Sequence, residues 1–161
     1  MNILVACEES QAVTIELRKR GHNAFSCDII ECSGGHPEWH IVGDVLPLLN
    51  GDCTFQTADT HTHTQAGQWD LIIAHPPCTY LSNAGAARLY KVIDGKHYID
   101  RDRFEKGMDA KEFFLSFLNA DCEHIAIENP TPSGVYRLPN YTQIIQPYEY
   151  GEPYSKRTCL W

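Results

Sequence analysis

The sequence predicts an α/β fold, in which a mostly parallel sheet carries helices on both of its faces. Short apolar runs that are typical of buried strands alternate with segments of helical periodicity. The first unit, residues 2–29, is a strand, a helix and a second strand with an acidic residue at its tip, which is how a nucleotide-binding βαβ unit begins. With 161 residues, the chain is long enough to form one domain with its own core.

Three strands and one helix are expected in the N-terminal half. The strand segments are short and apolar, and they cover 2–7, 23–29 and 41–45. A helix is expected from Gln11 to Arg20, because Ser10 or the acidic pair before it can cap its start and Gly21 can end it. The polar stretch 50–67 is expected to be an exposed, variable loop.

The C-terminal half contains the clearest helix and four further strand segments. The helix is expected over 104–119, where large apolar side chains fall largely on one face, and these side chains are interpreted as core rather than as a platform for stacking bases. The stretch 86–102 is expected to be a mobile crossover loop with little fixed structure. The strand segments are 69–74, 124–127, 142–145 and 158–161.

Composition and charge limit the possible functions. No apolar run approaches the length that spans a membrane, and the first residues lack the basic stretch of a secretion signal. The seven cysteines are scattered, so we expect reduced thiols in a cytoplasmic protein. The formal net charge of -8 disfavours nonspecific binding to nucleic acid, which depends on Lys and Arg neutralising phosphates.

Cys78 is the strongest candidate for a reactive side chain. The apolar run that ends at Ala74 is followed by His75-Pro76-Pro77, and the two prolines stop the strand directly before the thiol. In open α/β sheets, ligands bind beyond the carboxyl ends of the strands. Cys78 is therefore interpreted as a working thiol, with the alternative that it is one more small buried residue.

Other strand ends carry carboxylates. Asp28 and Asp44 follow predicted strands and suit the recognition of ribose hydroxyls, whereas Glu128 follows a later strand and suits acid catalysis. A strand-end capping role is the alternative for Glu128. The glycine-rich fingerprint for a pyrophosphate is missing, which favours a ligand with a ribose and no phosphates.

A metal site is not predicted. The side chains that would have to gather are Cys27, Cys32, His36 and His40, and their spacing matches no familiar zinc pattern.

Taken in their order along the chain, the strand-end motifs resemble those of the DNA (cytosine-5) methyltransferases. That family carries a Pro-Cys nucleophile, a Glu-Asn pair and a late Tyr-Gly-x-Pro segment, and the stretch Leu81–Gly85 also looks like its catalytic loop. The matching segments span nearly the whole chain; they are Leu4–Cys7, Cys27-Asp28, Gly43–Val45, Asp70–Cys78, Glu128–Pro130 and Tyr150–Pro153.

The resemblance implies a Rossmann-like, S-adenosylmethionine-dependent methyltransferase fold and a site for each reactant. Cys78 would add to carbon 6 of cytosine, Glu128 would protonate or hydrogen-bond ring nitrogen 3, and Arg157 would contact the base. Glu8, Glu9 and Ser10 would lie near the methionine part of S-adenosylmethionine, Asp28 near its ribose and Asp44 near its adenine. The remaining residues that the resemblance places at the cofactor are Cys7, Ile29, Val45 and Pro76.

The chain also departs from the family pattern. Residues 7–11 replace a glycine-rich turn, and the chain ends at Trp161, where the family continues into a target-recognition region and a closing helix. Residues 1–161 are therefore expected to be a single, small catalytic domain that acts on DNA cytosine, with DNA contacts supplied by a protein partner or a longer chain. The alternatives are an enzyme that modifies a free cytosine nucleotide and a catalytically silent binding protein.

Overall fold

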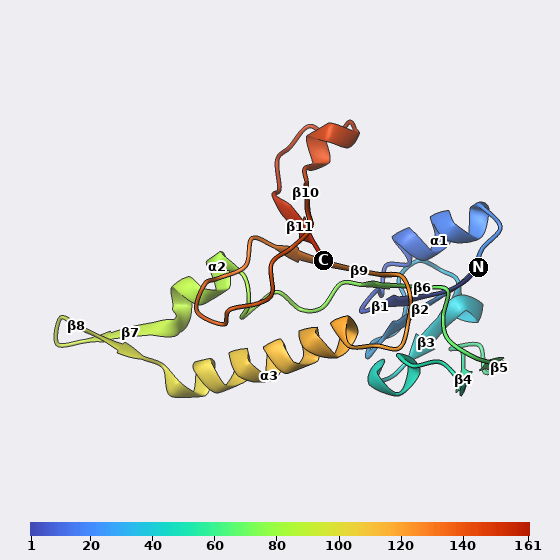
Figure 1. Ribbon diagram of the computed structural model, residues 1–161, viewed down its shortest axis with the longest axis horizontal. Coiled ribbons are helices and arrows are strands. Elements are labelled where there is room, and N and C mark those ends of the chain that lie inside the picture. The colour runs from blue at the N-terminus through green and yellow to red at the C-terminus, as the bar shows by residue number, and fades with distance from the viewer. The chain divides into compact units, whose positions relative to one another are not determined.

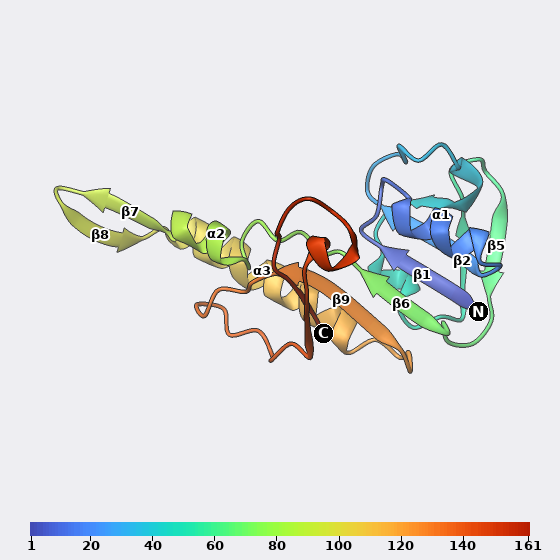
Figure 2. The same cartoon turned by 90° about the horizontal axis from the view of Figure 1, so that it is seen from above.

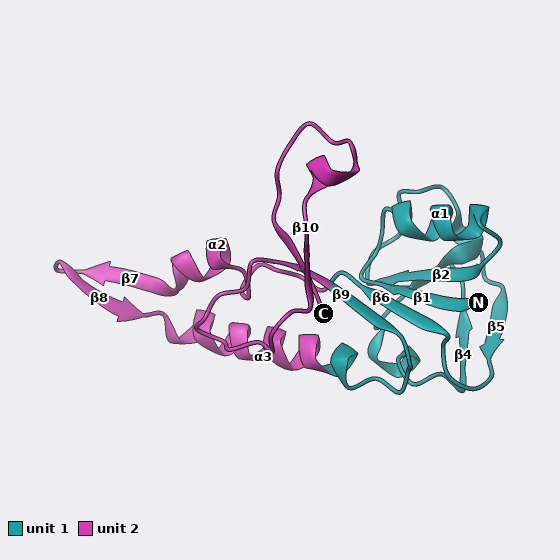
Figure 3. Ribbon diagram, turned by 45° about the horizontal axis from the view of Figure 1, so that its top comes forward, with its two compact units in different colours: residues 1–75, 116–127 teal, residues 76–115, 128–161 magenta.

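The computed structural model describes residues 1–161 as two compact units. Unit 1 contains residues 1–75 and 116–127, and unit 2 contains residues 76–115 and 128–161 (Figure 3). The seven-stranded main sheet has the strand order β10-β11-β9-β6-β1-β2-β3, and two separate hairpins, β4-β5 and β7-β8, complete the strands (Figure 1).

Unit 1 is built on a parallel sheet. Its strands β1, β2, β3 and β6 cover Asn2–Ala6, Asn23–Asp28, His40–Val42 and Leu71–Ala74, and the first half of β9 (Ile125–Pro130) pairs with β6. Helix α1 (Ala12–Lys19) connects β1 to β2 and lies beside them (Figure 2). Its apolar residues Val13 and Leu17 pack against the buried side chains of Ile3 and Val5, which anchors the helix on the sheet.

The predicted loop at 50–67 is wrong, because this stretch forms a hairpin of β4 (Cys53–Gln56) and β5 (Thr62–Gln65). A single apolar side chain, Phe55, fixes the hairpin by burying its ring against Phe25, at 5.0 Å between ring centroids. The buried indole of Trp69 lies 6.1 Å from the same ring. The polar residues on both sides of Phe55 hide the strand pattern, which is why the sequence reads as a loop.

Unit 2 is built on antiparallel strands. The second half of β9, residues 128–130, pairs with β11 (Thr158–Leu160), and β11 pairs in turn with β10 (Gln143–Ile145). Its other elements are α2, β7, β8 and α3, which cover Asn83–Ala86, Tyr90–Ile93, Lys96–Ile99 and Arg101–Leu118; the last residues of α3 belong to unit 1. No helix in the structure has the length and apolar character needed to cross a bilayer.

The predicted fold class, a Rossmann-like and mostly parallel sheet with helices on both faces, is wrong. The sheet is mixed, because β11 pairs antiparallel with β9 and β10 pairs antiparallel with β11. Only three α-helices form, and the connections from β2 to β3 and from β3 to β6 contain none. The connection from β2 to β3 holds a 3₁₀ turn at Pro37–Trp39, and the connection from β3 to β6 holds a 3₁₀ turn at Leu46–Leu48 and the β4-β5 hairpin in place of a covering helix. Each 3₁₀ turn has a proline near its start, which does not fit the interior of a longer helix.

The predicted unstructured loop at 86–102 is also wrong. A 3₁₀ turn at Ala87–Leu89 leads into the hairpin of β7 and β8. Asp94 and Gly95 make its two-residue turn with φ of 49° and 73°, which is the backbone that such a turn requires. The Asp-Gly pair between two apolar segments was the sequence signal for this hairpin. The other strand and helix predictions are confirmed, with ends that differ by a few residues.

Helix α3 approaches the segment after β9 at Gly107. A β-carbon at this position would lie 2.1 Å from the Tyr136 ring, so glycine is required by the close approach of the ring. The Tyr136 ring also stacks on Phe104, one turn earlier, at 5.8 Å between centroids. The packing of α3 within unit 2 therefore depends on Gly107 having no side chain, because the Tyr136 ring occupies that space.

We expect Gly107→Ala to lower the free energy of unfolding by about 1–3 kcal/mol, the usual cost of overpacking, although alanine favours a helix by about 1 kcal/mol. Urea unfolding measures the change. Gly134→Ala is the matched control, because nothing lies within 4 Å of the added β-carbon. Equal stability of the Gly107→Ala variant and the wild type would contradict this packing.

Candidate functional site

The carboxyl ends of β1, β2 and β3 meet at one edge of unit 1. The strand register pairs Ala6 with Cys27 and Asp28 with Val42, so the residues that follow each strand are neighbours. Burial, together with the smaller effects of the Asp28 and Asp44 charges, raises the pKa of the Cys7 thiol to about 12. Three of the predicted cofactor residues, Cys7, Asp28 and Asp44, are thus brought together.

Glu8 is the residue that caps helix α1. Its buried carboxylate accepts hydrogen bonds from the backbone N–H of Val13 at 2.6 Å and from the Thr14 hydroxyl at 2.7 Å. A carboxylate on the first turn of a helix satisfies amides that have no partner in the helix and interacts favourably with the helix dipole. Glu8 therefore fixes the turn between β1 and α1.

The other two residues of this turn are more accessible. Glu9 accepts a hydrogen bond from the Ser33 hydroxyl, and the Ser33 amide donates to the Glu9 carbonyl at 2.9 Å. Ser10 is exposed. The loop after β2 is therefore tied to the turn after β1.

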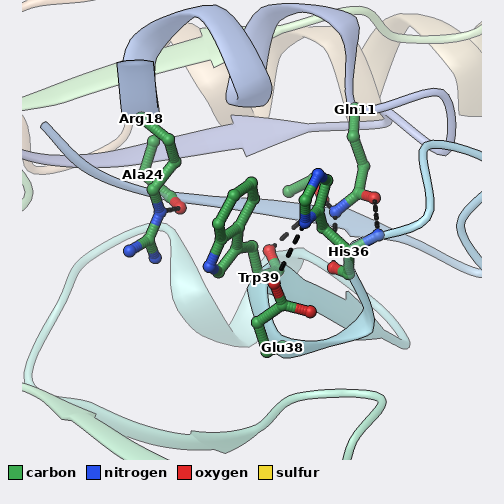
Figure 4. Close-up of polar contacts among 7 residues, drawn as sticks. Gln11, Arg18, Ala24, His36, Glu38 and Trp39 are labelled. Carbon is green, nitrogen blue, oxygen red and sulfur yellow. Dashed lines mark hydrogen bonds and ion pairs between the residues drawn. The ribbon is translucent and has the colours of Figure 1, made fainter. Parts of the chain in front are cut away.

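Gln11 makes a second tie between these segments, which sequence reasoning missed. Its side-chain amide donates to the His36 carbonyl at 2.9 Å and accepts from the His36 amide at 3.0 Å (Figure 4). Gln11 is buried in the left-handed conformation, with a φ of 59°. Gly34 fits below it, since a β-carbon there would lie 2.6 Å from the Ser10 carbonyl oxygen. The sequence shows only a glutamine at the start of a predicted helix, and nothing in it indicates that the side chain is buried.

The edge beside Asp44 is hollowed. A pocket of about 400 Å³ is lined by Asp44, Gly43, Val42 and residues of the β4-β5 connection. Ile29, directly after Asp28, is 78% exposed, whereas Val45 is buried. An exposed aliphatic side chain beside carboxylates offers an apolar surface to a flat ring and acceptors to hydroxyl groups.

In unit 2, the segment after Cys78 is bonded to the segment after β9. The Ser82 amide donates to the Cys78 carbonyl at 3.1 Å, and Ser82 forms a bridge with Pro132. The amides of Asn83 and Ser133 complete the connection; they donate to the carbonyls of Thr131 and Leu81, at 3.0 Å and 2.7 Å. Cys78 is half-buried and Pro76 is buried.

Glu128 and Arg157 are also on neighbouring segments of unit 2. The antiparallel register places Glu128 opposite Leu160 and Pro130 opposite Thr158, directly after Arg157. Burial raises the pKa of the Cys159 thiol; Arg157 opposes this shift, whereas the charge of Glu128 adds to it. Arg157 also donates to the Tyr141 hydroxyl at 2.9 Å.

Asn129, next to Glu128, has an unpaired acceptor. The residue is fully buried, and its amide nitrogen donates to the Pro130 carbonyl at 2.8 Å, but its amide oxygen has no hydrogen-bond partner. An unpaired buried polar atom costs roughly 1–3 kcal/mol, so the Asn129 oxygen is an acceptor that a water molecule or a bound group could satisfy. The structure thus brings Cys78, Glu128 and Arg157 onto three connected segments of unit 2, whereas the other predicted cofactor residues except Pro76 lie in unit 1.

Arg103 of α3 holds the segment after Cys78, and sequence reasoning missed it. Its guanidinium donates to the carbonyls of Thr79 at 3.2 Å and Gly85 at 3.0 Å, and it lies 4.9 Å from the Tyr80 ring centroid. Gly85 is required here, since a β-carbon would lie 2.1 Å from the Thr79 carbonyl oxygen. One arginine thereby closes the turn that carries the thiol.

Comparison with known proteins does not place the chain in a family. No protein-family model matches it, and no curated protein is significantly similar to it.

We expect Arg103→Met to speed amide exchange over 79–86 by about tenfold or more, because charged hydrogen bonds contribute roughly 1.5–3 kcal/mol each and exposure reduces this value. Hydrogen exchange followed by mass spectrometry measures the change. Arg101→Met is the control, since Arg101 is an exposed neighbour on the same helix. The same exchange rates in both variants would show that Arg103 does not hold the turn.

Proposed function

We propose that the chain is an S-adenosylmethionine-dependent enzyme that methylates carbon 5 of cytosine in DNA through a covalent adduct with Cys78. The observation that carries this proposal is the connection of three segments in unit 2. Backbone hydrogen bonds join the turn after Cys78 to the segment after Glu128, and β11 joins Glu128 to Arg157. A nucleophile, an acid and a cation on connected segments suit covalent catalysis on an electron-poor ring.

The proposed chemistry assigns one task to each side chain. The Cys78 thiolate adds to carbon 6 of the cytosine while Glu128, in its acid form, donates a proton to ring nitrogen 3, so that the electron pair reaches carbon 5. Carbon 5 then takes the methyl group, for which S-adenosylmethionine is the donor and S-adenosylhomocysteine the product. Water then takes the proton from carbon 5, the bond between carbon 6 and sulfur breaks to release the thiolate, and ring nitrogen 3 returns its proton to Glu128, which restores the ring and the acid. Arg157 is assigned to holding the base, and in a duplex the base must first leave the stack.

The edge of unit 1 fits the cofactor in part. The Asp28 carboxylate suits the ribose hydroxyls, exposed Ile29 suits the face of the adenine, and the pocket beside Asp44 has room for a ring. Glu8 does not fit a direct contact, because its carboxylate already binds the start of α1. Its task in this proposal is to shape the turn.

Charge favours one alternative substrate. The net charge of -8 leaves few cations to neutralise DNA phosphates, whereas a free cytosine nucleotide needs little basic surface. The chemistry at Cys78 and Glu128 would be the same. The substrate that forms the adduct therefore decides between DNA and a nucleotide.

Covalent trapping tests the chemistry. Duplex DNA with 5-fluorocytosine is expected to form a stable adduct with the protein in the presence of S-adenosylmethionine, because fluorine at carbon 5 blocks the final elimination. Cys78→Ser should abolish the adduct, since a serine hydroxyl stays protonated without a strong base. Glu128→Gln should slow its formation about a hundredfold, as is typical of a lost general acid.

Cys32→Ser is the control for trapping, because Cys32 is a partly exposed cysteine of unit 1 and should leave the adduct unchanged. Trapping with a 5-fluorocytosine nucleotide alone would move the function to the nucleotide. No adduct with either substrate, from protein that binds the cofactor, would exclude methyl transfer and leave a binding role.

Calorimetry tests the cofactor edge separately. Asp28→Ala should weaken the binding of S-adenosylmethionine about tenfold or more, since a hydrogen bond to a carboxylate contributes roughly 1.5–3 kcal/mol. Glu123→Ala removes an exposed carboxylate elsewhere in unit 1 and should not change the affinity. Equal affinity of the Asp28→Ala variant and the wild type would exclude this position for the ribose.

A further inference from the structure

The hairpin of β7 and β8 exposes every side chain on its two strands. Five of these side chains are large and apolar, with exposed fractions between 49% and 62%: Tyr90, Val92, Ile93, Tyr98 and Ile99. Figure 3 shows that the hairpin extends from α2 and the start of α3 at one end of unit 2. An isolated two-stranded hairpin is marginal in water, and a third strand or more is needed for independent stability. The hairpin therefore lacks a partner.

Each strand of the hairpin has an open edge with unpaired backbone groups. The strand register pairs Tyr90 with Ile99 and Lys91 with Tyr98, and only β7 and β8 form this sheet, so each strand has one open edge. The Asp100 amide donates to the Leu89 carbonyl at 2.8 Å. The backbone groups at even-numbered positions along β8 therefore point toward β7. Because inward and outward positions alternate, the backbone groups of His97 and Ile99 point to the open edge.

We propose that the open edge of β8 pairs with β8 of a second copy of this chain, antiparallel and around a two-fold axis at Tyr98. In this register His97 lies opposite Ile99 of the other copy, and these are the residues whose backbone groups point outward. The two Tyr98 side chains face each other as the closely spaced pair that does not share hydrogen bonds. The two hairpins together form a four-stranded sheet, with a symmetric interface in which the same edge is used twice.

Charge complementarity supports this register. Lys96 of one copy lies opposite Asp100 of the other, on the same face as the paired Tyr98 rings. Asp100 already binds Lys91 within its own copy, at 2.7 Å, so each carboxylate would lie between two ammonium groups. Opposite charges across paired strands stabilise them, and like charges directly opposite destabilise them.

The edge of β7 does not offer the same match. Its outward backbone groups belong to Tyr90 and Val92, so the equivalent two-fold pairing would centre on Lys91 and place two lysines opposite each other. Self-association through β7 is thus disfavoured by repulsion, while β8 is free of it. This difference between the edges commits the proposal to β8.

The interface is short, so a weak dimer is expected. Strands β7 and β8 have four residues each, and a contact of this length falls at or below the small end of specific interfaces. We expect a dissociation constant on the order of tens to hundreds of micromolar, which corresponds to about 5–6 kcal/mol. The dimer would therefore form and dissociate with protein concentration.

Sedimentation velocity on the full chain tests the association. The wild type is expected to shift from monomer toward dimer as its concentration rises from about 5 to 500 micromolar, a range that brackets this affinity. Ile99→Pro removes one outward N–H and should keep the chain monomeric, since proline on an edge blocks pairing. Val92→Pro removes an outward N–H from the β7 edge instead, and this variant should still dimerise. A wild type that stays monomeric throughout would overturn the proposal.

Disulfide trapping tests the register without depending on the proline variants. Tyr98→Cys, under mild oxidation, should give a dimer in which residue 98 is linked to residue 98, because this is the closely spaced pair on the axis. His97→Cys is the control and should give far less self-linkage, since residue 97 lies opposite residue 99. The linked peptides are identified by mass spectrometry, which separates them from links through the native cysteines. Equal self-linkage at both positions, or none at 98, would contradict the two-fold pairing.

Adding duplex DNA to the sedimentation experiment tests whether the edge of β8 binds nucleic acid and not a second copy of the chain. If the wild type dimerises, Ile99→Pro does not, and DNA binds to the wild type and both proline variants equally, the edge of β8 belongs to the second copy and the proposal stands. If Ile99→Pro abolishes DNA binding while the wild type alone remains monomeric, the edge of β8 belongs to nucleic acid and the proposal is overturned.

Discussion

Strand β9 changes its partner along its length, and the position of Glu128 in unit 2 depends on this change. Its first residues, Ile125–Ile127, pair in parallel with β6, and its last residues, 128–130, pair antiparallel with β11. Strand β6 ends at Ala74, because the prolines after His75 cannot continue a ladder. Glu128 is the first residue of β9 beyond that end. Because β6 ends before the Pro-Pro-Cys segment, β9 can pair with β11 from Glu128 onward, and Glu128 is the residue proposed as the acid.

The sequence predicted the elements better than their arrangement. Most strands and α3 were found because short apolar runs and a helical apolar stripe are local patterns. The direction in which β11 pairs is not local, since Thr158–Leu160 would look the same in a parallel strand. The hairpin at Tyr90–Ile99 had a clear turn signal in Asp94-Gly95, which the mixed charge of its strands concealed, whereas β4 and β5 had only Phe55 to indicate a strand.

The candidate site shows the same division. Residue types at strand ends indicated Cys78, Glu128 and Asp28 without a structure. What holds them was not predictable, because it comes from distant parts of the chain: Arg103 closes the turn after Cys78 from α3. Glu8 is a more direct case, since the sequence suggested both a helix cap and a ligand contact for it, and its carboxylate caps α1. A side chain that shapes a turn and one that touches a ligand have the same sequence signature.

Two cysteines follow central strands, and the surroundings of one of them disfavour a role as nucleophile. Cys7 follows β1 and Cys78 follows β6, so position alone makes both of them candidates for a nucleophile. Burial, with smaller contributions from the carboxylates of Asp28 and Asp44, raises the pKa of the Cys7 thiol to about 12. A raised pKa keeps the Cys7 thiol protonated at neutral pH, which disfavours it as a nucleophile because the thiolate is the reactive form. Burial does most to keep the Cys7 thiol protonated, the charges of Asp28 and Asp44 act in the same direction, and Cys78 remains the cysteine proposed as the nucleophile.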